Sequence, residues 1–408
     1  MRHAFLCSLL LLLVSPIYAQ KKNFTYSFYG FVRGDLYYNS RANVEAVDGN
    51  FYLFPLNKNL DPNGKDMNAA PNSSFYTFTT RFGIDMAGPK IGSASTSAKV
   101  ETDLGGFNLA HYTLRIRQAY VNLAWEKGSS LLLGQTWHPL FGEVLPDVLN
   151  LNTGSPFQPF NRSAQIRYQH KSSNITLTGS AIYQLVYLSA GPNGKSEEYQ
   201  KNAVIPELFA GINYHKDGFL GGAGVEMLSL KPRLNSTANG KTFKVDERIT
   251  SVSLMGQARY TANDWYVAGK TLYASNLTHT ALLGGYGVTS EDPNTGKQEY
   301  AASRHSTSWL NVVYGKKWKG GAFLGYTKNL GTGKPLVSTN KFYGSGVDID
   351  QLFSTSLLCS YDLPHWKAGV EYTLSSAWYG QTDLSNGKVK EAKAVTNHRI
   401  LLLFMYLF

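Results

Sequence analysis

The sequence is poor in the features that cross-link a chain, anchor it by helices or bind nucleic acid. It has only two cysteines, Cys7 and Cys359. No apolar run of about 18 residues follows the N-terminal segment, which excludes helical membrane spans in the rest of the chain. Charged residues make up 16% of the chain, and its net charge of +11 is spread thinly along it. Scattered basic residues do not form the patch that nucleic acid requires, so we expect no nucleic-acid partner.

Signatures of catalysis and of metal binding are also missing. His138 and His170 lie near Ser163, but no Gly-x-Ser-x-Gly elbow or paired-histidine helix motif accompanies them. No Cys/His cluster has the spacing of metal ligands. We therefore expect no catalytic residues, no metal and no cofactor, and hence no enzyme.

The N-terminus has the pattern of an export signal. Arg2 and His3 precede an apolar core at residues 4–14, and residues 15–19 look like a cleavage region. We expect a signal peptide at residues 1–19, followed by a single domain at residues 20–408. Cys7 leaves with the peptide, so Cys359 has no partner for an intramolecular disulfide.

The chain is rich in aromatic residues and glycine, which favour strands and turns. It has 26 Tyr, 21 Phe, 7 Trp and 39 Gly. Apolar and polar residues alternate with the period of a strand in sixteen segments. These lie near residues 24–39, 75–86, 98–104, 112–125, 130–137, 163–170, 174–189, 207–215, 219–230, 248–261, 265–277, 306–317, 321–330, 351–362, 366–379 and 395–408.

The connections between these segments alternate strictly between short and long. Outer-membrane barrels show this asymmetry, with short periplasmic turns and longer extracellular loops. The sequence therefore predicts an all-β fold, a closed antiparallel transmembrane β-barrel of about 16 strands. The even count places both termini in the periplasm. We expect the barrel to lie in the lipid of a Gram-negative outer membrane, with tryptophans at strand ends forming interfacial girdles.

The last segment, residues 395–408, shows both the pattern and an exception to it. Its even positions form an apolar row, as expected for a lipid-facing side, and end at Phe408. Its odd positions from Leu401 to Leu407 are also apolar, although they would face the lumen. Either this part of the lumen is dry and packed against an inward-folded segment, or the strand parity fails near the terminus.

Placing the apolar faces outward turns a set of basic residues toward the lumen. We expect the pore lining to contain Arg33, Arg81, Lys99, Arg115, Arg117, Arg167, Arg259, Lys270 and Arg399. Arginines on one wall, facing Glu101, Asp103 and loop acids, would create a transverse field that focuses anions. The alternative is structural, with Arg–Asp pairs that hold neighbouring strands together.

The connection at residues 138–162 is the candidate constriction. It is too apolar for a solvated loop, with Leu140, Phe141, Leu145 and Phe157 among its residues. Folding into the barrel would bury these side chains and leave Glu143 and Asp147 facing the arginines. The alternatives are an outer lid and a subunit-contact loop.

Three motifs resemble one family of porins. LRIRQAY at residues 114–120, LLLGQTWHPL at 131–140 and NRSAQIRY at 161–168 look like motifs of the DcaP-like trimeric porins of Gram-negative outer membranes. The resemblance covers the first 170 residues, and the chain lacks the N-terminal coiled coil that some members carry. It implies a homotrimer and diffusion of small, mainly anionic solutes.

We therefore predict an outer-membrane porin for passive diffusion of small hydrophilic, anionic solutes. The alternative is an adhesin or surface receptor that binds a partner through long extracellular loops at residues 40–74 and 278–305.

Overall fold

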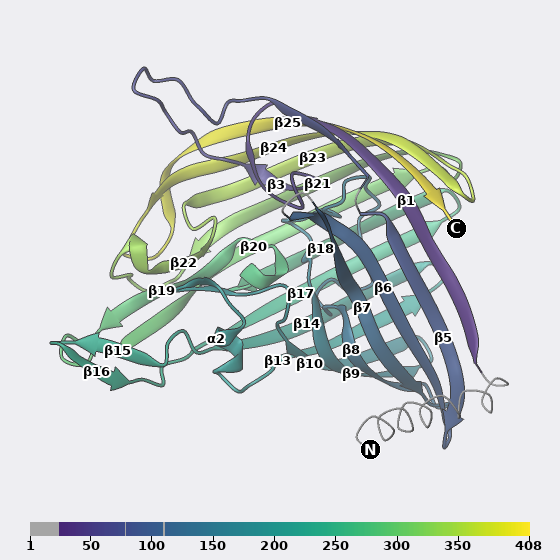
Figure 1. Cartoon of the computed structure of the whole chain (residues 1–408), viewed down its shortest axis with the longest axis horizontal. Helices are drawn as coiled ribbons and strands as arrows, with labels where there is room; N and C mark the ends of the chain where they lie inside the picture. Colours follow the sequence, from purple (N-terminus) through teal and green to yellow (C-terminus); the bar gives the residue numbers. More distant parts are fainter. Residues whose placement is uncertain (1–23, 78, 109–110) are drawn as a thin grey trace, which may run out of the picture.

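The computed structural model describes residues 24–408 except 78, 109 and 110, so the expected signal peptide lies outside the described residues. Nineteen strands form one sheet; β4, β19 and β22 are short additions, and the other sixteen close into an antiparallel barrel (Figure 1). The barrel strands are β1 Thr25–Asn39, β5 Arg81–Ile91, β6 Ala94–Asn108, β7 His111–Ala124, β8 Ser129–Trp137, β9 Arg162–Ser172, β10 Ile175–Tyr183, β13 Glu207–Lys216, β14 Phe219–Leu230, β17 Ile249–Ala262, β18 Trp265–Ser275, β20 Gln298–Tyr314, β21 Trp318–Gly331, β23 Ile349–Asp362, β24 Trp366–Thr382 and β25 Val389–Leu407. The predicted fold class and strand number are confirmed.

The barrel closes where the first strand meets the last. β1 pairs with β25 over its second half, from Phe31 opposite Leu407 to Asn39 opposite Arg399. Its other edge pairs with β5 and then with β4, Asn72–Tyr76. The sequence predicts one continuous strand at 75–86, and this is wrong, because the chain leaves the ladder between β4 and β5. Thr79 has a φ of 81° in that break, a conformation that ends regular pairing.

Short turns collect at one end of the barrel and long connections at the other. Residues 92–93, 125–128, 173–174, 217–218, 263–264, 315–317 and 363–365 connect strands at the short-turn end. The first residue of β1 and the last of β25 lie there too, since Thr25 pairs beside the first turn and the Leu407 amide donates to the His365 carbonyl. The predicted alternation is confirmed except between β6 and β7, because β6 ends at Asn108 and β7 begins at His111, so this connection does not belong to the long class.

The outward face of the barrel is apolar. On β25 the even residues Ile400, Leu402, Phe404 and Tyr406 are each 42–46% exposed. Trp265, Trp318 and Trp366 are also exposed at the short-turn ends of their strands, as a membrane girdle requires. Trp309 does not belong to a girdle, because it points inward and is only 4% exposed. A closed barrel with this belt is suited to a lipid bilayer, as in β-barrels of the outer-membrane type.

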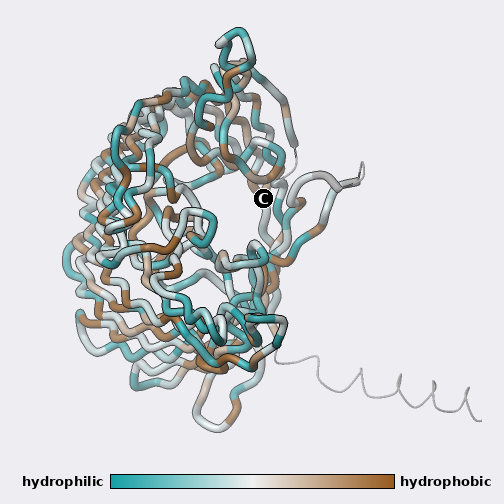
Figure 2. Tube along the Cα trace, turned by 90° about the vertical axis from the view of Figure 1, so that its left-hand side faces the viewer, coloured by the Kyte–Doolittle hydropathy of each residue, from teal (hydrophilic) through white to brown (hydrophobic). Residues whose placement is uncertain are grey.

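The long connections contain further small elements. They are β2 Asn43–Ala46, β3 Phe51–Pro55, β11 Ala190–Gly191, β12 Gly194–Lys195, α2 Glu198–Lys201, β15 Asn235–Ala238, β16 Lys241–Lys244, β19 Gly284–Glu291 and β22 Phe342–Ser345, with 3-10 turns η1 Thr278–Thr280 and η2 Thr339–Lys341. The β15–β16 hairpin projects at one end in Figure 1. Figure 2 shows other segments inside the ring that the strands outline. In the described part of the chain, no helix is long and apolar enough to span a membrane.

The apolar odd row of the last strand lies in a dry part of the lumen. Leu401, Leu403 and Met405 form a buried cluster with Tyr37 and Leu149. Leu149 belongs to the connection after β8, which has folded inward. The first of the two explanations for this row is therefore correct, and the parity of β25 holds to its end.

Candidate pore site

The connection at residues 138–161, which we call the lumen loop, crosses the barrel interior and is fixed to the opposite wall. Lys270 on β18 donates to the carbonyls of Leu140 and Phe141 at 3.0 and 2.6 Å. Glu371 on β24 accepts from the backbone amides of Leu149 and Asn150 at 2.6 and 3.2 Å. Hydrogen bonds to strands this far along the chain hold the loop across the lumen.

Apolar packing completes this attachment. Leu140, Val144, Leu149 and Phe157 are each at most 3% exposed. Phe157 lies on Gly325 of β21, where an added Cβ would come within 2.3 Å of its ring, and Leu149 lies on Gly369 of β24 at 2.6 Å. Only glycine at these two wall positions lets the loop approach so closely.

A second segment that the sequence did not place also enters the barrel. β2 and β3 form a hairpin whose Phe51, Tyr52 and Phe54 are at most 6% exposed. Phe51 packs edge-to-face on Phe160 of the lumen loop, and the Tyr52 carbonyl accepts from Asn152. The segment 40–74 is therefore not a free surface loop as the receptor alternative requires, because part of it fills the lumen.

The part of the barrel wall formed by β1 and β5–β7, which we call the arginine wall, carries a network of ion pairs. Arg115 forms a bidentate pair with Asp103 at 2.6 and 3.1 Å. Arg117 bridges Glu101 and Asp103, both at 2.7 Å. These acids do not face the arginines from across the lumen as expected but lie between them on β6. The strand-to-strand pairing that the sequence left as an alternative is present.

Two of the four arginines on this wall have more access to the lumen than the carboxylates that pair with them. The side chains of Arg81 and Arg115 are 21% and 26% exposed, whereas those of Glu101 and Asp103 are 6% and 0% exposed. Asp35, paired with Arg33 at 2.7 Å, is also fully buried. The carboxylates lie behind the guanidinium groups, so this wall presents positive charge to the interior although the network is nearly balanced.

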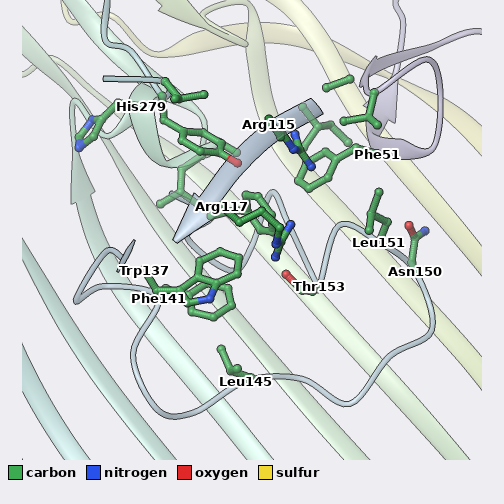
Figure 3. Close-up of a pocket in the computed structure, with 18 of the residues that line it drawn as sticks. Phe51, Arg115, Arg117, Trp137, Phe141, Leu145, Asn150, Leu151, Thr153 and His279 are labelled. Atoms are coloured by element: carbon green, nitrogen blue, oxygen red, sulfur yellow. The ribbon is translucent and has the colours of Figure 1, made fainter. Parts of the chain in front are cut away.

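A cavity of about 580 Å³ separates this wall from the lumen loop and the β2–β3 hairpin (Figure 3). Its basic lining residues are Arg33, Arg81, Arg115, Arg117 and Lys195, with His279 at its edge. Its aromatic lining residues are Phe31, Phe51, Trp137, Phe141, Phe160 and Tyr187. Among the described residues that line it, none is Asp or Glu.

The remaining predicted lining residues lie elsewhere. Lys99 pairs with Asp85 on the arginine wall, and Arg167 donates to the Trp137 carbonyl beneath the loop. Arg259 donates to the Glu143 carbonyl at 3.4 Å. Arg399 does not face open space, because it is 1% exposed, with its guanidinium 4.2 Å from the ring centre of Tyr37.

The two acids of the lumen loop, Glu143 and Asp147, lie away from the arginine wall of β1 and β5–β7. Glu143 accepts from Asn213 at 2.9 Å on the β13 side, and Asp147 pairs with Lys319 on β21 at 3.3 Å. Glu143 still has Arg259 beside it, but Asp147 faces a lysine, so the expectation that both acids face arginines is only partly met.

Two features of the lumen were not identified from the sequence. Arg162, at the start of β9, is 2% exposed and lies over the rings of Trp137, Phe160 and Tyr187. The sequence places position 162 at the end of a loop, and the nearby Phe160 is a local signal of the cation–π cluster.

The second feature is a buried cluster at the root of the lumen loop. Glu207 on β13 lies 2.8 Å from His138 Nε2 and 3.0 Å from His279 Nε2, and all three residues are at most 1% exposed. The residues are far apart in the sequence, which conceals the cluster. It joins the lumen loop and η1 to one wall strand.

Two histidines and a glutamate are residue types that can bind a metal ion. The hydrogen bonds of these three residues instead place a histidine proton between His138 and Glu207. Their ligand atoms lie within 4.8 Å of one another. The Leu140 amide donates to His138 Nδ1 at 3.1 Å, so the ring proton belongs on Nε2 and points at Glu207. A metal-binding histidine instead donates through the nitrogen that is not bound to the metal. The geometry therefore fits a loop anchor, in which burial lowers the pKa of His138 against the opposing effect of Glu207.

Comparisons with known proteins show the fold. No family model and no curated protein matches the chain. OmpT of Vibrio cholerae, folded in vitro, superposes with a TM-score of 0.57 at 12% identity, covering 96% of this chain and 100% of that one. An anion-selective porin from Comamonas acidovorans gives 0.55 at 9%, covering 94% and 100%. OmpF of Salmonella typhi, in complex with daunomycin, gives 0.54 at 12%, covering 94% and 97%. The chain has a porin-type barrel.

Proposed function

We propose that this protein is an outer-membrane porin through which small hydrophilic solutes diffuse passively, with a preference for anions. The observation that carries the proposal is the cavity beside the lumen loop, which is lined by four arginines and a lysine and by no described carboxylate. Positive charge in a narrow, partly dewatered space attracts anions and raises the barrier to cations.

The lumen loop is the constriction in this proposal. It divides the lumen because its apolar side chains cover one wall while the arginine wall stays in contact with the cavity. Arg33, Arg81, Arg115 and Arg117 line the passage. Glu101 and Asp103 fix the guanidinium groups, so that they meet a solute in one orientation.

Planar-bilayer recording of the purified protein tests this proposal. We expect stepwise open channels and, in a KCl gradient, a reversal potential of the sign that chloride permeation gives. Membranes that stay tight would overturn the porin assignment. Channels with a cation-type reversal potential would overturn the anion preference alone. The receptor alternative predicts tight membranes.

We also infer a homotrimer of the DcaP-like type, on the resemblance of residues 114–120, 131–140 and 161–168 to that family. Unheated protein should then migrate on an SDS gel as a trimer and convert to monomer on heating. Migration as a monomer under the mildest detergent conditions, together with a monomer mass from light scattering, would contradict this assembly.

A further inference from the structure

The cavity beside the lumen loop has two chemically different halves. One half is the arginine wall of β1, β5 and β7. The other half consists of apolar side chains of the lumen loop and of the β2–β3 hairpin, among them Phe51, Phe141, Leu145 and Leu151. A solute that only carries charge can use one half, whereas one that also has an apolar body can use both.

Arg81 is the most weakly paired of the four arginines that line the cavity. Arg33, Arg115 and Arg117 each form at least one ion pair of 2.6–2.7 Å with a buried carboxylate. Among the described residues, Arg81 has only a long contact of 3.9 Å with Glu101, made through its buried Nε, and its side chain is 21% exposed. Its guanidinium also lies over the ring of Phe31 on β1, at 4.7 Å, and both residues line the cavity. A weakly paired and partly exposed guanidinium at this position can donate to an acceptor on the solute.

The apolar half is fixed in place rather than free to collapse. Phe141 stacks on Trp137 with ring centres 3.9 Å apart and an interplanar angle of 9°. Phe51 meets Phe160 edge-to-face at 4.8 Å. The backbone of Leu145 is tied to β18 by the hydroxyl of Tyr266. The surface is therefore preorganised, and an apolar ligand does not have to order it on binding.

The volume and the lining together select a ligand class. About 580 Å³ lies within the range of sites that enclose small organic molecules, roughly 300–1,000 Å³. A strongly hydrated anion, such as a sugar acid, would have to turn its hydroxyls toward aromatic and leucine side chains that cannot pair with them.

We propose that this cavity is a binding site for amphipathic organic monoanions, such as a carboxylate attached to an aromatic ring. The carboxylate accepts from Arg81, with Arg117 and Arg115 behind it, and the ring lies against Phe51, Leu145 and Leu151. The proposal rests on the porin function and adds to it the class of solute that the pore retains longest.

Two monoanions of similar size, benzoate and gluconate, test it in single-channel recordings. Benzoate should interrupt the chloride current at a concentration about tenfold lower than gluconate, because only benzoate gains from burying apolar surface. Equal block by the two anions in a channel that is anion-selective would overturn this inference and leave the proposed function intact. A tight or cation-selective membrane would instead overturn the proposed function.

Variants assign the effect to the two halves. The double change Leu145→Asn and Leu151→Asn should abolish the preference for benzoate while anion selectivity remains, whereas Arg81→Gln should weaken block by both anions. Leu60→Asn, in an exposed part of an outer loop, is the matched control and should change neither. A preference for benzoate that survives the double change would overturn the assignment.

Calorimetry of the wild-type protein in detergent decides the matter if the double variant does not fold. Titrated benzoate should give a saturable heat and gluconate none at the same concentrations. A saturable heat for neither, or for both alike, would overturn the proposal.

Discussion

The two sides of the lumen wall use inward-facing polar residues for opposite purposes. On β1 and β5–β7, charged side chains pair with one another and keep their guanidinium groups in contact with the cavity. On β18–β24, Lys270, Trp309 and Glu371 form hydrogen bonds with the lumen loop and are at most 4% exposed. An inward-facing polar residue in a barrel therefore does not always contact the water of the pore. Whether it faces solute or fixes a loop depends on which wall the loop covers.

Removing a carboxylate from the ion-pair network of the arginine wall should have the largest effect on stability and on ion selectivity. Asp103→Asn removes the carboxylate that holds both Arg115 and Arg117, and loss of one partner from a buried ion pair costs about 3–5 kcal/mol. The free guanidinium groups should at the same time increase the preference for anions. Urea unfolding in detergent and reversal potentials measure the two effects, which should move in opposite directions. Asp217→Asn, in an exposed short turn, is the control. A selectivity that falls with stability would show that the wall only holds strands together.

Removing a hydrogen bond between β18–β24 and the lumen loop should cost less stability than a change in the arginine wall. It should change the channel current rather than the ion selectivity. Glu371→Ala leaves the amides of Leu149 and Asn150 without their acceptor in a buried place, at about 2 kcal/mol. We expect a noisier channel as the loop loosens, with an unchanged reversal potential. Glu299→Ala, on the exposed face of β20, should leave both recordings unchanged. A quiet channel in the Glu371 variant would show that packing alone fixes the loop.

Removing the weakest ion pair of the arginine wall should sharpen the comparison further. Arg81→Gln leaves Glu101 paired with Arg117, so stability should change little. The anion-to-cation permeability ratio should fall about two- to threefold, because one of the lining charges is lost. Lys58→Gln, an exposed charge in an outer loop, serves as the control. An unchanged ratio would move the selective step away from this wall.

Acidification should produce the smallest effect, a loss of stability through the His138–Glu207 contact that anchors the lumen loop. Burial lowers the pKa of His138, so the anchor with Glu207 is at full strength above the unfolded-state pKa of about 6.5. Below that pH the unfolded chain takes up a proton that the folded chain resists, and stability falls until the folded pKa is reached. Melting curves between about pH 7.5 and 5 should show this loss, and His138→Gln should reduce it. The same change at half-exposed His170 should not. Equal pH dependence in the wild type and the His138 variant would contradict the assignment.

The fold was predictable because its signals are local. Alternation with period two marked most strands within a few residues, and the two classes of connection gave the topology. It placed the end of β10 at 189 rather than 183, and the starts of β20 and β25 at 306 and 395 rather than 298 and 389. The break between β4 and β5 escaped because its cause is a backbone conformation at Thr79, which no residue preference there signals.

Of the candidate site, only the arginine wall could be predicted, because it is formed by strands that are adjacent in the sequence. Lys99, Glu101 and Asp103 alternate on β6, and Arg115 and Arg117 follow on the next antiparallel strand, so their cross-strand pairing is implied by the register. The β2–β3 hairpin, Arg162 and the cluster of His138, Glu207 and His279 depend on contacts between distant segments. Residue types alone cannot locate such contacts.

The inner row of β25 has a consequence for assembly. Leu401, Leu403 and Met405 lie on the strand that seals the barrel against β1, and they pack on Leu149 of the lumen loop and Tyr37 of β1. Until β25 is in place, that end of the loop lacks part of its apolar cover. We expect sealing of the barrel and docking of the loop to occur as one cooperative step. A chain that has not finished folding would then be a wide, leaky barrel, and the last strand to pair would also set the width of the pore.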